Sequence, residues 1–279
     1  MEIIDSFLSY GGQQKVIRHK SELLSCDMTF ALYEPESFEE RNCPVLWYLS
    51  GLTCSHANVM EKGEYRRVAS ELGIIIVCPD TSPRGDHIPD EPENWQFGKG
   101  AGFYLDALQA PYNENYKMYS YITEELPKLL RDKCLIDSTS QGVFGHSMGG
   151  HGAICIALKN PGKFKSCSAF APITQPSTAT WSKKAYEKYL GDNQETWRLY
   201  DTTRLLEDGH FFSEILVDQG LADPFLEDGL RPDLLKIACE EAGVSLDLRL
   251  RDKYDHSYYF ISTFMESHLR WHYERLART

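Results

Sequence analysis

One short segment places a reactive side chain between glycines. Gly145-His-Ser-Met-Gly149 has the pattern G-x-S-x-G, with Ser147 at its centre. An apolar run over 142–145 precedes the serine and an Ala/Ile/Leu-rich run follows it, which predicts a strand, a sharp turn and a helix. Such a turn holds the hydroxyl clear of the sheet, at the positive end of the helix dipole. In this context Ser147 is predicted to be a nucleophile, whereas the pattern alone could be an ordinary turn before a helix.

A serine hydroxyl is a weak nucleophile near neutral pH, so a histidine must take its proton and an acid must orient that histidine. At an elbow of this kind the chain order is serine, then Asp or Glu, then histidine. His256 lies in a polar turn before the last predicted helix and is the favoured base. His268 and His272 fall inside that helix, where they would pack on the sheet or face solvent. Their spacing could also form half of a metal site, although no H-E-x-x-H glutamate accompanies them.

Two aspartates follow the fifth predicted strand and could supply the acid. Asp223 is preferred because it lies a few residues into the loop, where Pro224 would stiffen the backbone. Asp218 stands directly at the strand end and could instead cap a turn. Asp255 is a poor candidate, since its side chain and that of the adjacent His256 diverge.

Acyl transfer also needs backbone N–H groups that face the negative charge developing on the carbonyl oxygen. Met148, the residue after the nucleophile, is predicted to supply one of them. Leu52 is the candidate for the other, because it follows an earlier apolar strand; Gly51 would give that turn its backbone freedom. Cys54, in the same turn, would lie near the nucleophile. It is either a thiol that makes activity sensitive to oxidation or an inert packing residue.

Alternating strands and helices would position these residues. Apolar, β-branched runs predict strands at 45–49, 74–78, 142–145, 167–170, 214–217 and 246–250, after an antiparallel strand or hairpin within the first 35 or so residues. Helical spacing predicts helices at 65–72, 118–130 (interrupted by Pro127), 148–159, 232–242 and 258–276. This order predicts an α/β fold with a mainly parallel central sheet and helices on both faces. Together with the serine elbow, it is the order of the α/β-hydrolase fold.

Length and composition fit one domain over 1–279, with a cap segment at 172–190 that contains Trp181. The formal net charge of −12 argues against a nucleic-acid partner. No apolar run is long enough to span a membrane, and no secretory signal is visible at the N-terminus. The eight cysteines lack disulfide or metal-site spacing, so they indicate reduced thiols and a cytoplasmic protein.

Five blocks in the same order resemble the S-formylglutathione hydrolases, also called the esterase D family, over nearly the whole chain. The blocks are Ser50-Gly-Leu-Thr-Cys54, Thr81-Ser-Pro-Arg-Gly85, Gly100-Ala-Gly-Phe-Tyr104, Gly145-His-Ser-Met-Gly-Gly-His151 and Tyr254-Asp-His-Ser-Tyr-Tyr-Phe260. The resemblance implies hydrolysis of S-formylglutathione to glutathione and formate, with side activity on small esters. It also implies a homodimer and no cofactor or metal.

By motif match, the family's triad falls on Ser147, Asp223 and His256. Its oxyanion donors fall on Leu52 and Met148, and its thiol-sensitive cysteine on Cys54. The segments Thr180-Trp-Ser182 and Asn94-Trp-Gln-Phe97 depart from the usual family pattern, which affects the expected leaving group.

Since glutathione is anionic, Arg84, Lys183 and Lys184 are candidate binding residues beside Trp181. The main alternative is a broad carboxylesterase or deacetylase that acts on small oxygen esters. An acyltransferase and a non-catalytic binding protein are weaker alternatives.

Overall fold

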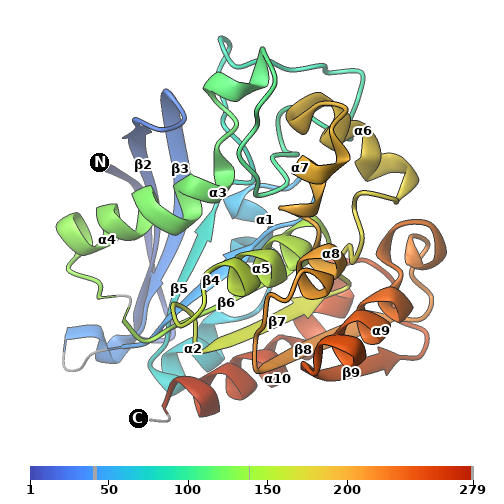
Figure 1. Ribbon diagram of the computed structural model, residues 1–279. Helices are drawn as coiled ribbons and strands as arrows, with labels where there is room; N and C mark the ends of the chain where they lie inside the picture. Colours follow the sequence, from blue (N-terminus) through green and yellow to red (C-terminus); the bar gives the residue numbers. More distant parts are fainter. Residues whose placement is uncertain (40–42, 138, 278–279) are drawn as a thin grey trace.

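The computed structural model describes residues 1–39, 43–137 and 139–277. In these residues nine strands form one sheet in the order β1-β2-β3-β5-β4-β6-β7-β8-β9 (Figure 1). The strands are β1 (Glu2–Ser9), β2 (Gly12–Ser21), β3 (Cys26–Glu34), β4 (Val45–Leu49), β5 (Ile75–Pro79), β6 (Gln141–His146), β7 (Ser166–Phe170), β8 (Glu214–Gly220) and β9 (Ser245–Arg251). The first three strands pair antiparallel, and β3 joins β5 antiparallel. The remaining pairs, from β5-β4 along to β8-β9, are all parallel.

Helices cover both faces of this sheet, as the strand pattern predicts, and the α/β-hydrolase fold is confirmed (Figure 1). The helices are α1 (His56–Lys62), α2 (Arg66–Leu72), α3 (Met118–Ser120), α4 (Leu126–Cys134), α5 (Met148–Lys159), α6 (Thr180–Leu190), α7 (Gln194–Arg198), α8 (Thr202–Glu207), α9 (Pro232–Ala242) and α10 (Tyr258–Leu276). Strands β4 to β7 are buried along their whole length, which fits the continuous apolar runs of β4 and β5. None of the helices in the described ranges has the length and apolar character to cross a membrane.

The helix predicted at 118–130 continues past Pro127 instead of being interrupted by it. A π-helical turn over Tyr121–Glu125 joins α3 to α4, and Pro127 lies in the first turn of α4, where its missing N–H costs least. The carbonyl of Thr123, four residues before the proline, accepts a hydrogen bond from Lys163 Nζ instead. The proline therefore lies at a junction between two helical segments, and the chain keeps its direction there.

Between β7 and β8 the chain leaves the sheet and forms α6, α7 and α8. The predicted cap segment, 172–190, contains α6, which lies beside the loops above the end of the parallel strands (Figure 1). Tyr189 connects α6 to a glycine-rich loop over residues 97–104: its hydroxyl accepts from Gly98 N (2.7 Å) and donates to Ala101 O (2.9 Å). Both segments are thereby held over the carboxyl ends of the parallel strands, where Ser147 lies.

A continuous chain of buried polar side chains attaches α10 to the opposite face of the sheet. Ser168 Oγ lies 2.8 Å from both His268 Nδ1 and His272 Nε2, and His272 Nδ1 is 2.6 Å from Ser166 Oγ. His268 Nε2 then reaches Asp218 Oδ2 at 3.0 Å. His268 and His272 therefore pack on the sheet, one of the two positions that the sequence left open.

Buried histidines make the fold sensitive to acid. Burial lowers the pKa of His268, against the influence of Asp218, and lowers the pKa of His151 to about 4, against that of Asp201. The pKa values of His146 and His272 lie well below the ordinary value, again mainly because of burial. In the unfolded chain each would titrate near pH 6.5, so below that pH the unfolded state binds more protons and stability falls.

We therefore expect the free energy of unfolding to decrease as the pH falls from 7.5 to 5.5, by about 1.4 kcal/mol per buried histidine at the lower pH. Urea unfolding at the two pH values measures this change. Replacement of the exposed His87 by glutamine is the control, and it should leave the pH dependence unaltered. Equal stability at both pH values would show that these histidines become protonated within the folded protein.

Candidate active site

The backbone at Ser147 has the strained geometry of a nucleophile elbow. Ser147 has φ 57° and ψ −119°, directly between β6 and α5, and its N–H donates to Phe170 O at 2.9 Å. The turn depends on close backbone contacts, because a Cβ on Gly149 would lie only 2.0 Å from Leu49 O. We infer that strain is concentrated at the serine itself, as expected where the chain must present a side chain.

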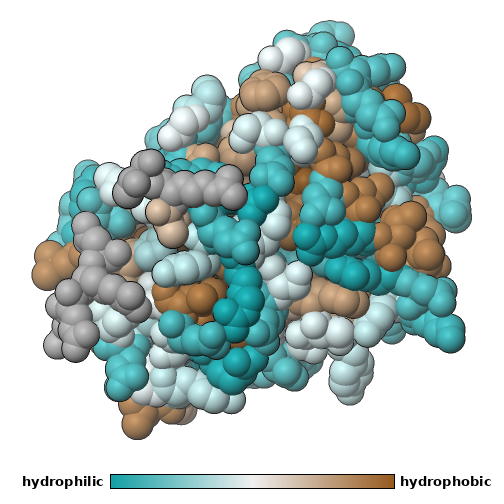
Figure 2. Space-filling view, turned by 90° about the horizontal axis from the view of Figure 1, so that it is seen from below, coloured by the Kyte–Doolittle hydropathy of each residue, from teal (hydrophilic) through white to brown (hydrophobic). Residues whose placement is uncertain are grey.

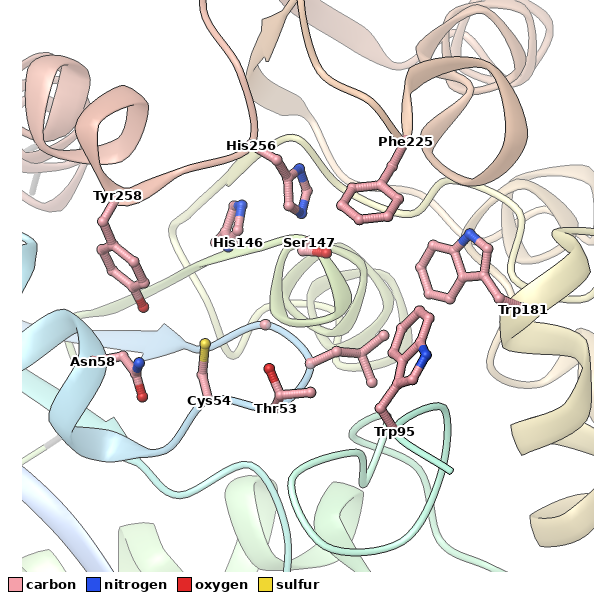
Figure 3. A pocket seen from close by; sticks show the side chains of 12 residues that line it. Thr53, Cys54, Asn58, Trp95, His146, Ser147, Trp181, Phe225, His256 and Tyr258 are labelled. Atoms are coloured by element: carbon pink, nitrogen blue, oxygen red, sulfur yellow. The ribbon is translucent and has the colours of Figure 1, made fainter. Parts of the chain in front are cut away.

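His256 and Asp223 meet at the same edge of the sheet. His256 Nδ1 lies 2.5 Å from Asp223 Oδ2, and Asp223 Oδ1 accepts from Phe225 N at 2.9 Å. The Asp223 side chain is fully buried. Figure 3 shows the imidazole of His256 directed toward Ser147. The carboxylate of Asp223 therefore holds Nδ1 of His256, and Nε2 remains available on the side of Ser147.

Asp218, the alternative acid, serves the core instead. Its carboxylate lies between Arg251 Nε (2.6 Å) and His268 Nε2 (3.0 Å). Burial would raise its pKa, but these two partners outweigh burial and lower it. Asp218 is the last residue of β8 paired with β7, and its side chain projects to the α10 face, away from His256.

The two predicted oxyanion donors lie on either side of the serine. Met148 is the first residue of α5, so its N–H has no partner within the helix. In the turn after β4, Thr53 N donates to Gly100 O and Cys54 N to Gly51 O, while in the described parts of the chain no acceptor meets Leu52 N. Both N–H groups are thus free to bind a substrate oxygen.

Gly51 does not serve as the flexible backbone position of this turn, as we expected from the sequence. Gly51 has no positive φ; the left-handed residue of this turn is Thr53, with φ 65°. Glycine at 51 leaves space beside the nucleophile, since a Cβ there would approach Ser147 Cβ closely, to 3.2 Å. The glycine-rich loop supports the turn from beneath through Gly100 and does not itself line the cavity.

Ser147 opens into a cavity of about 400 Å³. Its wall is formed by Gly51, Leu52, Thr53, Cys54, Asn58, Trp95, His146, Ser147, Trp181, Phe225, His256 and Tyr258. On one side of Ser147, Figure 3 shows three aromatic rings, and their centroids are 5.9 Å apart for Trp95–Trp181 and 6.3 Å for Trp181–Phe225. Phe225 also meets the ring of His256 edge-on at 5.1 Å.

Of the tentative binding residues, Trp181 and Cys54 line the cavity, whereas Arg84 and Lys184 do not. The Arg84 guanidinium is occupied by Asp80 Oδ1 (2.9 Å) and by the carbonyl of Cys54 (3.0 Å), so it supports the turn from outside. Lys184 is exposed on α6. Burial raises the pKa of the Cys54 thiol, against the effect of Tyr258, which favours the protonated, packing form of this cysteine.

Six wall residues were not predicted from the sequence: Thr53, Asn58, Trp95, His146, Phe225 and Tyr258. Phe225 and Tyr258 each follow a predicted triad residue by two positions, and this short spacing was the only local signal for them. Thr53 and His146 are sequence neighbours of predicted site residues. Asn58 lies in α1 and Trp95 in a separate loop, so only the tertiary structure brings these two here. In the described residues no group of three or more His, Cys, Asp or Glu side chains could hold a metal ion.

The fold and the elbow define the class of this protein as an α/β-hydrolase. The sequence model of the "Putative esterase" family matches residues 21–271. The S-formylglutathione hydrolase of Bos taurus is 50% identical over 96% of each chain, and that of Paracoccus denitrificans is 45% identical over 99% of this chain and 98% of its own. A solved S-formylglutathione hydrolase from Agrobacterium tumefaciens is 61% identical, with a TM-score of 0.98, over 99% of this chain and 100% of that one.

At this identity and coverage the chain belongs to the S-formylglutathione hydrolases, within the esterase family. It is a serine hydrolase.

Proposed function

We propose that this protein hydrolyses S-formylglutathione to glutathione and formate, with Ser147 as nucleophile, His256 as general base and acid, and Asp223 as the group that orients His256. The observation that carries the proposal is the contact between His256 Nδ1 and the buried Asp223 carboxylate at a cavity that Ser147 shares. The names of the relatives supply the substrate.

The reaction would proceed in two halves. His256 Nε2 takes the proton of Ser147 Oγ, which attacks the thioester carbonyl while Leu52 N–H and Met148 N–H bind the oxyanion. The C–S bond breaks, the thiol leaves with the proton from His256, and a formyl ester remains on Ser147. His256 then deprotonates a water that attacks this ester, and it returns the proton to Ser147 Oγ as the ester C–O bond breaks and formate leaves. A thiolate is a good leaving group, so protonation by His256 matters less than in amide cleavage.

A neutral cavity wall supports a second candidate, a carboxylesterase that acts on small oxygen esters. Apart from its two histidines, the wall contains no ionisable basic side chain. The expected cationic contacts from Lys184 and Arg84 to a glutathione carboxylate do not reach this cavity. Recognition inside it must therefore rest on the acyl group and on apolar contact with the leaving group.

The two candidates predict different ratios of kcat/KM for S-formylglutathione and p-nitrophenyl acetate. If the thioester is the physiological substrate, we expect its kcat/KM to exceed that of the ester by at least about 100-fold, since binding outside the cavity would add to acyl recognition. Steady-state kinetics at one pH measures the ratio, with S-formyl-N-acetylcysteamine as the control thioester without glutathione. A ratio near one would favour the esterase.

We also propose a role in formaldehyde detoxification, a cytoplasmic location and a homodimer. The exposed strand β1 supports the last of these. It is an edge strand of the sheet and carries exposed apolar side chains at Ile3, Ile4, Phe7 and Leu8. Apolar side chains at an unpaired edge favour association with another chain, here a second copy. Seen from below, the molecule also carries apolar residues that gather in separate surface patches (Figure 2). The mass in solution tests the dimer.

A further inference from the structure

The base of the proposed triad stands on a loop. His256 belongs to the segment 252–257, between the end of β9 and the start of α10. Asp223 holds Nδ1 of its ring at 2.5 Å, but one hydrogen bond at one atom does not fix the plane of the ring. General acid–base catalysis needs Nε2 within hydrogen-bond reach of Ser147 Oγ and then of the leaving group. The ring plane therefore needs a further contact to hold it.

Two aromatic rings flank the His256 imidazole. In Figure 3 it stands between the rings of His146 and Phe225. The ring centroid of His146 lies 4.3 Å from that of His256, with 45° between the two planes. The ring centroid of Phe225 lies 5.1 Å from it, with 73° between the planes. Rings at these separations are in contact, so the imidazole meets a neighbour if it tilts to either side.

Of the two flanking rings, that of His146 has a rigid support. His146 is the last residue of β6, is buried, and pairs with Phe170 of β7. The turn that carries Leu52 closes the space behind the ring, because a Cβ on Gly51 would lie only 3.2 Å from His146 Nδ1. A side chain that projects from a central strand is held more precisely than one on a loop. His146 thus gives the loop residue His256 a fixed surface.

His146 is neutral beside the base. Burial, and after it the charge of His256, lower the pKa of His146 well below its ordinary value. Near neutral pH the ring therefore carries no charge that would repel the imidazolium which forms when His256 takes the serine proton. The contribution of His146 to the reaction is then contact, and it has no proton to give or take.

We propose that His146 is a positioning residue for the base: with Phe225 it holds the imidazole of His256 in the plane that directs Nε2 at Ser147 and at the leaving group. The inference rests on the proposed function, because it concerns the same base. The step affected is the first half of the reaction. There the proton of Ser147 Oγ moves to Nε2 and then to the leaving group, whose bond to the carbonyl carbon breaks.

The test compares phenyl acetate with p-nitrophenyl acetate, which form the same acetyl ester of Ser147 and differ only in the leaving group. Phenolate is the poorer leaving group, so its departure depends more on a proton from His256. We expect His146→Ala to lower kcat/KM about tenfold for p-nitrophenyl acetate and about 100-fold for phenyl acetate, because the acid and base is slightly misplaced. The ratio of the two values does not depend on the fraction of folded protein.

Three further variants complete the experiment. His151→Ala removes another buried imidazole, which contacts Thr202 Oγ1 (3.0 Å) and the Tyr186 hydroxyl (3.2 Å) and lies outside the cavity wall. It should cost stability and leave the ratio at its wild-type value. His146→Leu fills the space without a flat ring, so it should lower the ratio in a protein that folds. His146→Phe restores a flat ring and should bring the ratio back toward wild type.

An unchanged ratio in both His146→Ala and His146→Leu would overturn the inference, even if the rates for both esters fall together. A ratio as low in His146→Phe as in His146→Ala would also overturn it, since the ring nitrogens rather than ring contact would then be responsible. Loss of turnover of S-formylglutathione by the wild-type protein would instead contradict the proposed function. It would leave this result in place, because the two acetates alone report on His256.

Discussion

Replacing Ser147 with alanine is expected to lower kcat for p-nitrophenyl acetate by about 10⁵-fold, with loss of labelling by a fluorophosphonate. A serine that forms the covalent intermediate cannot be bypassed, and the activity that remains would come from the oxyanion donors alone. Steady-state kinetics and the labelling stoichiometry measure the two effects. Residual activity within tenfold of wild type would exclude Ser147 as the nucleophile.

Ser168→Ala is the matched control. Ser168, His268 and Asp218 form a second Ser–His–Asp arrangement, with contacts of 2.8 Å and 3.0 Å, but all three side chains are buried and none lines the cavity. The variant should keep its fluorophosphonate labelling and kcat per folded molecule. It should lose about 1–3 kcal/mol of stability, because it leaves buried imidazole nitrogens without a partner. Loss of labelling in this variant would mean that the core arrangement is involved in catalysis.

Asp223→Asn is expected to lower kcat by about 10⁴-fold while the fold stays intact. An amide at this position can donate to His256 Nδ1, which would place the imidazole proton on Nε2 and block its role as base. Steady-state kinetics over a range of pH measures kcat, and urea unfolding measures whether the fold stays intact. A loss of activity that matches a loss of folded protein would contradict this assignment.

Asp218→Asn separates the two aspartates that the sequence presents as rivals. It leaves Arg251 and His268 without their buried carboxylate, and breaking a buried pair in this way costs about 3–5 kcal/mol. We expect a large fall in the unfolding midpoint and a kcat per folded molecule close to wild type. The reverse pattern would assign Asp218, rather than Asp223, to the catalytic role.

Local sequence signals determined the framework of this protein. The parallel strands were predictable because buried strands form short apolar runs. The elbow was predictable because an apolar strand, Ser147 between glycines and an apolar helix follow one another directly. His256 was also accessible from chain order, since it lies in a polar turn between the last strand and α10. These features depend on residues that are close in sequence.

Only the tertiary structure decided which distant residues meet. It placed the Asp223 carboxylate on His256 and directed Asp218 to α10, because Asp218 lies within β8 whereas Asp223 lies in the loop beyond its end. It also excluded Arg84 from the cavity, because Asp80 holds its guanidinium. The cavity wall brings together side chains from helices, loops and a strand that are far apart along the chain, and their mutual distances follow from packing, which no local pattern of residues encodes.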